Sequence, residues 1–191
     1  MHIVFGGSFN PPTKAHVQII KYLCAVFPSS KVIIVPVGDD YRKPELAPFH
    51  MRFDMLKLAV NDLDRVILSP IESNQGYQGT LRTLDDLSKT YQDIHFVIGS
   101  DHLKGLRAWI KYEELLRRYP FIVINRRGYL SQEEAEAMYK DVEHRFIYLP
   151  FDDISASTLI RKNKHQFKDM LDPNVYEYIL KHQLYEVNTH V

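Results

Sequence analysis

Thr13 and His16 lie three positions apart, where a strand-like segment gives way to a helical pattern. The strand-like segment ends in the glycine pair Gly6-Gly7, which lets the backbone pass close to a ligand or adopt positive φ. A helix N-terminus presents unpaired N–H groups and a partial positive charge, and both suit a phosphate. His16 can add a hydrogen-bond donor or, when protonated, a full positive charge. The pattern therefore predicts an anion site. The alternative is a glycine-rich turn with a capping threonine and an exposed histidine.

A second group of residues with the same chemistry lies near the other end of the chain. Ser157 and Thr158 open a predicted helix, since small hydroxyl side chains can cap its unpaired N–H groups. Arg161 follows four and three residues later, so the three side chains share one face of that helix. Hydroxyls, helix N–H groups and a guanidinium together can hold a polyphosphate. A capped helix with a solvated arginine is the alternative, but two predicted anion sites in one chain favour the polyphosphate.

The segments between these two sites alternate between β-rich runs and amphipathic helical patterns. Several runs are nearly continuous in Val and Ile, which is typical of strands covered on both faces. This alternation predicts an α/β fold with a doubly wound, mostly parallel, Rossmann-like sheet and helices on both faces. The predicted strands are His2–Phe5, Lys31–Val35, Arg65–Ser69, Ile94–Ile98, Phe121–Ile124 and Arg145–Leu149.

Helices are predicted where apolar residues recur at helical spacing. A last helix is expected after Asp172, which would cap it, with Pro173 in its first turn. Since no linker or repeat divides the chain, residues 1–191 are predicted to form a single domain. Its C-terminal helical portion, at about 153–185, carries the second anion site. The predicted helical segments and packing stripes are Ile20, Leu23, Cys24 and Phe27; Met51, Met55, Leu58 and Ala59; residues 80–91; and Val175, Tyr178 and Ile179.

The loop after the first predicted strand is the first place to expect a ligand. Ligands of open parallel sheets collect at the carboxyl ends of the strands, near the point where the strand order reverses. The loop contains no G-x-x-x-x-G-K-[ST] sequence, and no G-x-G-x-x-G follows the first strand. The chain is therefore neither a recognisable P-loop kinase nor a standard dinucleotide-binding protein.

Composition narrows the function further. Lysine plus arginine equals aspartate plus glutamate, at 24 each, so no global field draws the chain to nucleic acid or to a membrane. The single cysteine, Cys24, excludes an internal disulfide and offers no zinc ligand set. No apolar run approaches the roughly 20 residues of a membrane span, and the N-terminus lacks signal-peptide architecture. We expect a soluble cytoplasmic protein.

Together, the two predicted anion sites resemble the signature of the nucleotidylyltransferase superfamily. Its first motif is usually [HT]-x-G-H, and its second resembles I-S-S-T-x-x-R. More narrowly, the chain resembles the bacterial nicotinate-nucleotide adenylyltransferases over nearly its full length. Residues 6–16 match the glycine-rich loop of that family, and residues 98–101 match its I-G-[AS]-D motif. Further segments of the chain also match the family pattern. They are residues 42–44 together with residues 51–56, residues 80–84, Trp109, residues 175–179 and residues 184–185.

The chain departs from the family pattern at four places. Thr13 stands where this group more often has a histidine, and Ala15 replaces the usual glycine, which should crowd ATP slightly. The serine–tyrosine pair before the T-x-x-T-L segment reads Gln78-Gly79 here. The second motif carries one more residue than usual, which leaves the register of Ser155 open.

The resemblance implies transfer of AMP from ATP to nicotinate mononucleotide in NAD biosynthesis, with release of pyrophosphate. A phosphate oxygen of the acceptor would be the nucleophile, and since its second pKa is about 6 it needs no general base. Catalysis would then come from positioning and preorganised positive charge. Mg²⁺ would enter with ATP, held mostly by phosphates and waters rather than by protein ligands. The implied catalytic residues are His16, Thr13, Arg161 and Lys43.

The same resemblance implies which residues contact each substrate. Lys43 would meet the phosphate of the acceptor, and Thr80 and Trp109 would flank its pyridine ring. Asp101 would accept hydrogen bonds from ribose hydroxyls, with a helix-capping role as the alternative. The residues implied to bind ATP are Gly6, Gly7, Ser8, Phe9, Thr13, His16, Ser157, Thr158 and Arg161. The residues implied to bind the acceptor are Lys43, Thr80, Asp101, Trp109 and Arg126.

Three other functions stay open at this point. The acceptor can be nicotinamide mononucleotide, since one substituent separates it from nicotinate mononucleotide and Gln78-Gly79 gives no preference. The chain can be another adenylyl- or cytidylyltransferase of the superfamily, such as a phosphopantetheine adenylyltransferase, which Thr13 favours slightly. It can also be a non-catalytic nucleotide-sensing module, although such a module has little use for a histidine that acts in the transition state. A homo-oligomer is possible, and the sequence does not set its size.

Overall fold

A single parallel sheet organises the chain in a computed structural model that describes residues 1–41, 45–73, 77–126, 128–150 and 167–186. The strand order is β3-β2-β1-β4-β5-β6, and each neighbouring pair is parallel. The predicted α/β, doubly wound, Rossmann-like sheet is therefore confirmed. The strands are β1 (His2–Gly7), β2 (Lys31–Pro36), β3 (Val66–Leu68), β4 (Ile94–Gly99), β5 (Phe121–Asn125) and β6 (Phe146–Pro150).

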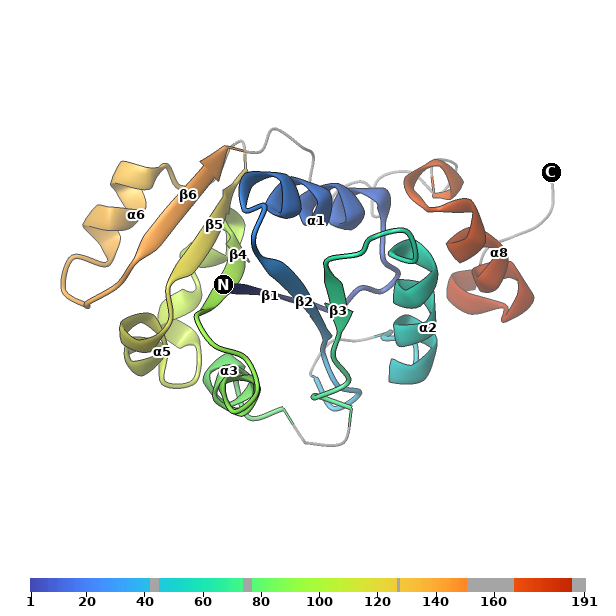
Figure 1. Cartoon of the computed structure of the whole chain (residues 1–191), viewed down its shortest axis with the longest axis horizontal. Helices are drawn as coiled ribbons and strands as arrows, with labels where there is room; N and C mark the ends of the chain where they lie inside the picture. Colours follow the sequence, from blue (N-terminus) through green and yellow to red (C-terminus); the bar gives the residue numbers. More distant parts are fainter. Residues whose placement is uncertain (42–44, 74–76, 127, 151–166, 187–191) are drawn as a thin grey trace.

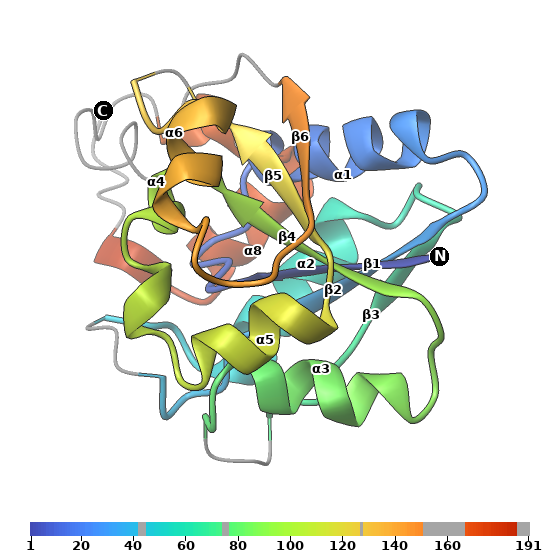
Figure 2. The same ribbon diagram turned by 90° about the vertical axis from the view of Figure 1, so that its left-hand side faces the viewer.

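Helices cover both faces of this sheet. Figure 1 shows α1 and α3 on opposite sides of it, and Figure 2 shows the molecule from the β6 edge. The two faces are set by alternation along each strand, since successive side chains point to opposite sides. Ile3 packs with α1 and α2, whereas its neighbour Val4 packs with α3 to α6. The helices that cover the sheet are α1 (Lys14–Val26), α2 (Phe49–Ala59), α3 (Thr80–Ser88), α4 (Ser100–Leu103), α5 (Tyr112–Arg118) and α6 (Gln132–Met138). A 3₁₀ turn, η1 (Leu106–Ala108), joins α4 to α5.

The C-terminal helix α8 (Pro173–Lys181) packs on α2 rather than on the sheet. Its N-cap is Asp172, whose carboxylate accepts the N–H of Asn174 at 2.8 Å, with Pro173 in the first turn as predicted. Val175 and Ile179 are buried against Met55 of α2. Two 3₁₀ turns flank this helix, η3 (Lys168–Met170) and η4 (Leu184–Glu186).

The predicted stripe on α2 turns out to face α8. Met55, Leu58 and Ala59 of that stripe pack in the cluster with α8, whereas Leu56 faces the sheet. The helix thus has two apolar faces, and a single stripe predicts only one of them. Within the described residues, no helix is long and apolar enough to cross a membrane.

Candidate active site

The strand order reverses between β1 and β4, which are neighbours in the sheet. The chain leaves β1 toward α1 on one face and leaves β4 toward α4 on the other. In open parallel sheets, this reversal is where ligands bind. Gly6 and Gly7 are the last two residues of β1 and pair with Val35 and Pro36 of β2. The predicted ligand loop therefore begins at the switch point of the sheet.

Phe9 forms the core of the loop after β1. It is buried, has a φ of 44°, and its ring packs edge-on against Phe5 and His16 at centroid distances of 5.5 and 5.1 Å. A Cβ on Gly7 would come within 3.2 Å of that ring, tighter than most real contacts, so glycine suits this position. The Phe9 side chain is thus a packing element, and the loop can offer its backbone to a ligand.

Thr13 and His16 form a local pair at the first turn of α1. Thr13 is the N-cap, is only 1% exposed, and donates its backbone N–H to His16 Nδ1 at 2.9 Å. Its hydroxyl Oγ1 also lies 2.9 Å from the same nitrogen. Because Nδ1 accepts a backbone N–H, it carries no proton, and the neutral ring holds its proton on Nε2. The threonine therefore fixes both the orientation and the tautomer of the histidine.

Arg52 of α2 is a buried residue that the sequence did not single out. It is 0% exposed, and its guanidinium donates to the carbonyl oxygens of Ser8, Val37 and Ala47 at 3.0, 2.8 and 2.7 Å. The exposed carboxylate of Asp39 accepts a fourth bond at 3.1 Å. These bonds join the loop after β1, the end of β2 and the entry to α2. Because a guanidinium has five donors in one plane, it can hold three carbonyls at fixed separations.

Asn10 provides a second connection between the same segments. Its Nδ2 donates to the carbonyl of Glu45 at 2.9 Å, and its Oδ1 accepts the N–H of Ala47 at 3.0 Å. Glu45 comes two residues after Lys43, the residue predicted to meet the acceptor's phosphate. The loop after β1 is thus tied to the segment that follows Lys43.

Asp101 and Arg126 lie together at the carboxyl ends of β4 and β5. Arg126 Nη1 donates to Asp101 Oδ2 at 2.8 Å, and the Arg126 backbone N–H donates to Ser100 Oγ at 2.9 Å. The other carboxylate oxygen, Asp101 Oδ1, is buried and has no hydrogen-bond partner within the part of the chain that the structure describes. A Cβ on Gly99 would lie 2.2 Å from that oxygen, so only glycine leaves room for the carboxylate there.

Thr80 and Trp109 belong to two segments that touch. Thr80 begins α3 directly after Gly79, which has a φ of 93°. A Cβ on Gly79 would lie 2.9 Å from Cβ of Ile110, the residue after Trp109. The Trp109 ring is half-buried and meets Phe96 of β4 edge-on at 6.2 Å. The tryptophan ring thus packs partly against the core, while its neighbour Ile110 reaches the start of α3.

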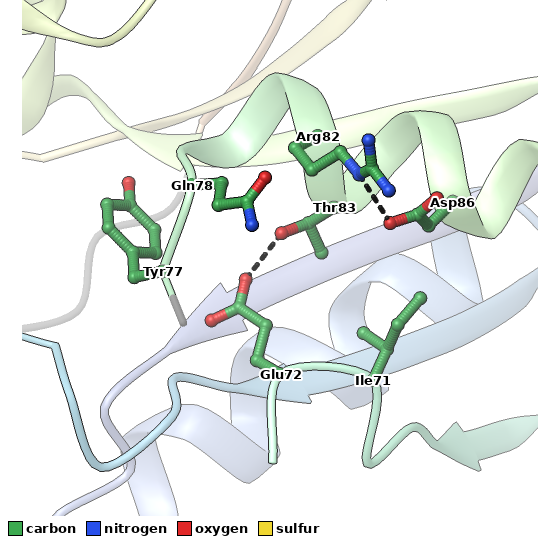
Figure 3. A pocket seen from close by; sticks show the side chains of 7 residues that line it. All are labelled: Ile71, Glu72, Tyr77, Gln78, Arg82, Thr83 and Asp86. Atoms are coloured by element: carbon green, nitrogen blue, oxygen red, sulfur yellow. Dashed lines mark hydrogen bonds and ion pairs between the residues drawn. The ribbon is translucent and has the colours of Figure 1, made fainter. Parts of the chain in front are cut away.

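A small pocket lies beside the first two turns of α3, and Figure 3 shows the side chains around it. Its main polar feature is Glu72, whose Oε1 accepts the hydroxyl of Thr83 at 2.6 Å. Burial raises the pKa of Glu72, and the bond from Thr83 opposes that shift. None of the lining residues is a predicted site residue, and Arg82 there is paired with Asp86 at 2.8 Å. The lining residues are Ile71, Glu72, Tyr77, Gln78, Arg82, Thr83 and Asp86.

The structure shows three separate contacts that involve the predicted site. Thr13 bonds His16, Asn10 of the loop after β1 bonds the segment that follows Lys43, and Asp101 pairs with Arg126 at the neighbouring strand ends. Four predicted residues lie outside the described ones, and their roles stay predictions. They are Lys43, Ser157, Thr158 and Arg161. Among the described residues, no three His, Cys, Asp or Glu side chains are grouped to hold a metal ion.

Relatives of known family match the chain over almost its whole length. The chain matches the Cytidylyltransferase-like family over residues 4–163. A "Probable nicotinate-nucleotide adenylyltransferase" of Acholeplasma laidlawii is 39% identical over 187 residues, which cover 97% of this chain and 98% of that protein. This chain belongs to the nicotinate-nucleotide adenylyltransferase family. A protein of the same name from Caldicellulosiruptor bescii is 37% identical over 194 residues, covering 96% of this chain and 97% of that protein.

Solved structures of more distant proteins share the fold. Plasmodium falciparum nicotinic acid mononucleotide adenylyltransferase complexed with NaAD has a TM-score of 0.77 and 24% identity, covering 99% of this chain and 98% of that chain. The same protein complexed with APC has a TM-score of 0.76 at the same identity and coverage. The family resemblance read from the sequence is thus confirmed, and with it the assignment to the nucleotidyltransferases.

The buried guanidinium gives a stability prediction. Arg52→Lys should lower the free energy of unfolding by about 3 kcal/mol, because an ammonium cannot bond three separated carbonyls and leaves buried acceptors unpaired. Urea denaturation with a spectroscopic readout measures this change. Arg82→Lys is the matched control, since Arg82 is exposed, and it should cost less than about 0.5 kcal/mol. Equal losses for the two variants would show that the guanidinium fork is not what holds the three segments.

Proposed function

We propose that this chain transfers the AMP part of ATP to nicotinate mononucleotide, with nicotinate adenine dinucleotide and pyrophosphate as products. Family membership and the names of its relatives support this reaction. The observation that carries it is the Thr13–His16 pair, set at a helix N-terminus on the switch point of the sheet. That arrangement is suited to an anion that gains charge during a reaction.

The reaction is a displacement at the α-phosphorus of ATP. A phosphate oxygen of the acceptor forms the new P–O bond, the bond between the α-phosphorus and the bridging oxygen breaks, and pyrophosphate leaves with that electron pair. The attacking oxygen is already largely deprotonated at neutral pH, since its second pKa is about 6. No side chain has to remove a proton, so the protein supplies positioning and charge stabilisation.

His16 is the group we assign to the α-phosphate. Its Nδ1 is held by the N–H of Thr13, so a hydrogen bond to a phosphate oxygen comes from Nε2–H. A donor whose direction is fixed in advance stabilises developing charge without reorganising during the reaction. Thr13 is 1% exposed, so we assign it to the support of His16 rather than to direct contact with ATP.

Other roles follow from the same proposal. Ser157, Thr158 and Arg161 would hold the triphosphate and Lys43 the acceptor's phosphate. ATP would enter as its Mg²⁺ complex, with the ion bound by phosphates and waters as part of the substrate. Asp101 Oδ1, a buried oxygen without a hydrogen-bond partner among the described residues, supports a role in accepting a ribose hydroxyl. The proposed reaction is expected to take place in the cytoplasm.

The acceptor is tested by measuring pyrophosphate release with MgATP and one acceptor at a time. Nicotinate mononucleotide should give the highest kcat/KM, because the chain belongs to the family named for it. Nicotinamide mononucleotide and phosphopantetheine are the comparison substrates. A higher kcat/KM for either of them would replace the proposed acceptor. Binding of MgATP without any pyrophosphate release would point to the nucleotide-sensing module instead.

The role of His16 is tested by His16→Ala. This change should lower kcat by about 100- to 1,000-fold, the usual effect of removing one preorganised donor from a developing charge. The dissociation constant for ATP, measured by calorimetry, should rise by less than about three-fold, because the lost bond matters most in the transition state. His2→Ala is the matched control, since His2 begins β1 and thus lies at the opposite end of that strand from the loop that leads to His16. Equal losses in kcat and in ATP affinity would make His16 a binding group.

A further inference from the structure

The C-terminal segment of the chain contacts both sides of the Thr13–His16 turn. Tyr185 donates its hydroxyl to Asn10 Oδ1 at 2.7 Å, and Asn10 lies three residues before Thr13. Lys14, the residue after Thr13, donates its ammonium to the carbonyl oxygen of Asp169 at 2.8 Å. The turn that presents His16 is therefore bonded on each flank to residues 167–186.

Asn10 is the point where three distant segments meet. Its Oδ1 accepts two hydrogen bonds, one from the Ala47 N–H at 3.0 Å and one from Tyr185, and its Nδ2 donates to Glu45 at 2.9 Å. A carboxamide oxygen has two lone pairs, and both are used here. If the Tyr185 hydroxyl is lost, the side chain keeps its bonds to residues 45–47 but loses its bond to the C-terminal segment.

The Tyr185 hydroxyl is held firmly enough to act as a fixed donor. Tyr185 adopts a left-handed backbone conformation with a φ of 62°, and its ring lies 6.2 Å from that of Phe167. Both rings pack in the cluster that joins α8 to α2. Burial raises the pKa of Tyr185, so its hydroxyl keeps its proton and remains a donor at neutral pH.

We propose that Tyr185 is a positioning residue for the catalytic turn and acts through Asn10. The bond from its hydroxyl fixes the middle of the loop after β1, between the carbonyl of Ser8 that Arg52 holds and the cap at Thr13. A small displacement of this loop would misplace His16 relative to the α-phosphorus, and positional errors of about 1 Å cost rate steeply. The kinetic part of this inference rests on the proposed function.

The kinetic test uses Tyr185→Phe, which removes one oxygen atom and keeps the packing of the ring. We expect kcat to fall by about three- to ten-fold, the effect of one hydrogen bond, with KM for ATP changed by less than about two-fold. Tyr178→Phe is the matched control. Tyr178 lies on α8, in the same C-terminal segment, but its hydroxyl bonds Asp54 of α2 at 3.5 Å rather than the loop after β1. Unchanged kcat in Tyr185→Phe, or an equal fall in Tyr178→Phe, would overturn the proposal.

A double-mutant cycle tests the route through Asn10. In an Asn10→Ala background, Tyr185→Phe should change kcat by less than about 1.5-fold, because the acceptor of its hydroxyl is already gone. If the fold-decreases in kcat of the two single variants multiply in full in the double variant, Tyr185 acts by another route and the proposal fails.

Hydrogen exchange provides a readout that does not depend on the reaction or on the folding of the Asn10 variant. Backbone amides of residues 8–17 should exchange faster in Tyr185→Phe than in the wild type and in Tyr178→Phe. Equal exchange in all three proteins would overturn the proposal even if AMP transfer is confirmed. Faster exchange in Tyr185→Phe, together with a wild-type protein that transfers no AMP to any acceptor, would refute the proposed function and leave the positioning role standing.

Discussion

A guanidinium shielded from solvent needs oxygen atoms around it, and that requirement shapes the carboxyl edge of this sheet. Arg52 finds three acceptors in the carbonyls of Ser8, Val37 and Ala47. Past the strand ends, the Val37 N–H still donates to the Gly7 carbonyl at 3.0 Å, and Arg52 adds the bonds to Ser8 and Ala47. The planar fork sets their separations, since its N–H groups point in fixed directions. The loop after β1 therefore starts from a fixed point, and Asn10 can reach the residues that follow Lys43.

The chain as a whole carries equal numbers of acidic and basic residues, so any attraction for an anion has to come from local groups. At the start of α1, the N–H of Thr13 is directed at His16 Nδ1 rather than outward. The helix N-terminus thus contributes a fixed imidazole as well as its remaining N–H groups and its dipole. A ring fixed in this way reaches a phosphate through one nitrogen only.

The sequence predicted the sheet well because its information is local. All six strands were expected within two residues of their observed ends, since runs of Val and Ile between helical patterns mark parallel strands. The Thr13–His16 pair was also within reach, because both residues lie on one turn. Arg52 was missed because a lone arginine on a helix usually lies in solvent. One signal could have found it: Arg52 precedes the buried residues Met55 and Leu56 by three and four positions, on the apolar side of α2.

Contacts between distant parts of the chain were beyond prediction from spacing. The bond between Tyr185 and Asn10 joins residues 175 positions apart, and neither residue type suggests the other. The same holds for the pairing of Asp101 with Arg126, which follows only from the neighbouring positions of β4 and β5. Periodicity gives the faces of each element, whereas such side-chain pairs depend on which elements become neighbours and in what register.

The contact between Gly79 and Ile110 shows why glycine suits the residue before α3. A side chain at position 79 would meet Ile110, whose Cβ lies 2.9 Å from the place of a Cβ at that position. Gly79 and Ile110 are therefore matched, and an aromatic residue at 79 would have to displace Ile110. Ile110 is 52% exposed and follows Trp109 directly, so the apolar surface beside the start of α3 comes from the α4–α5 connection.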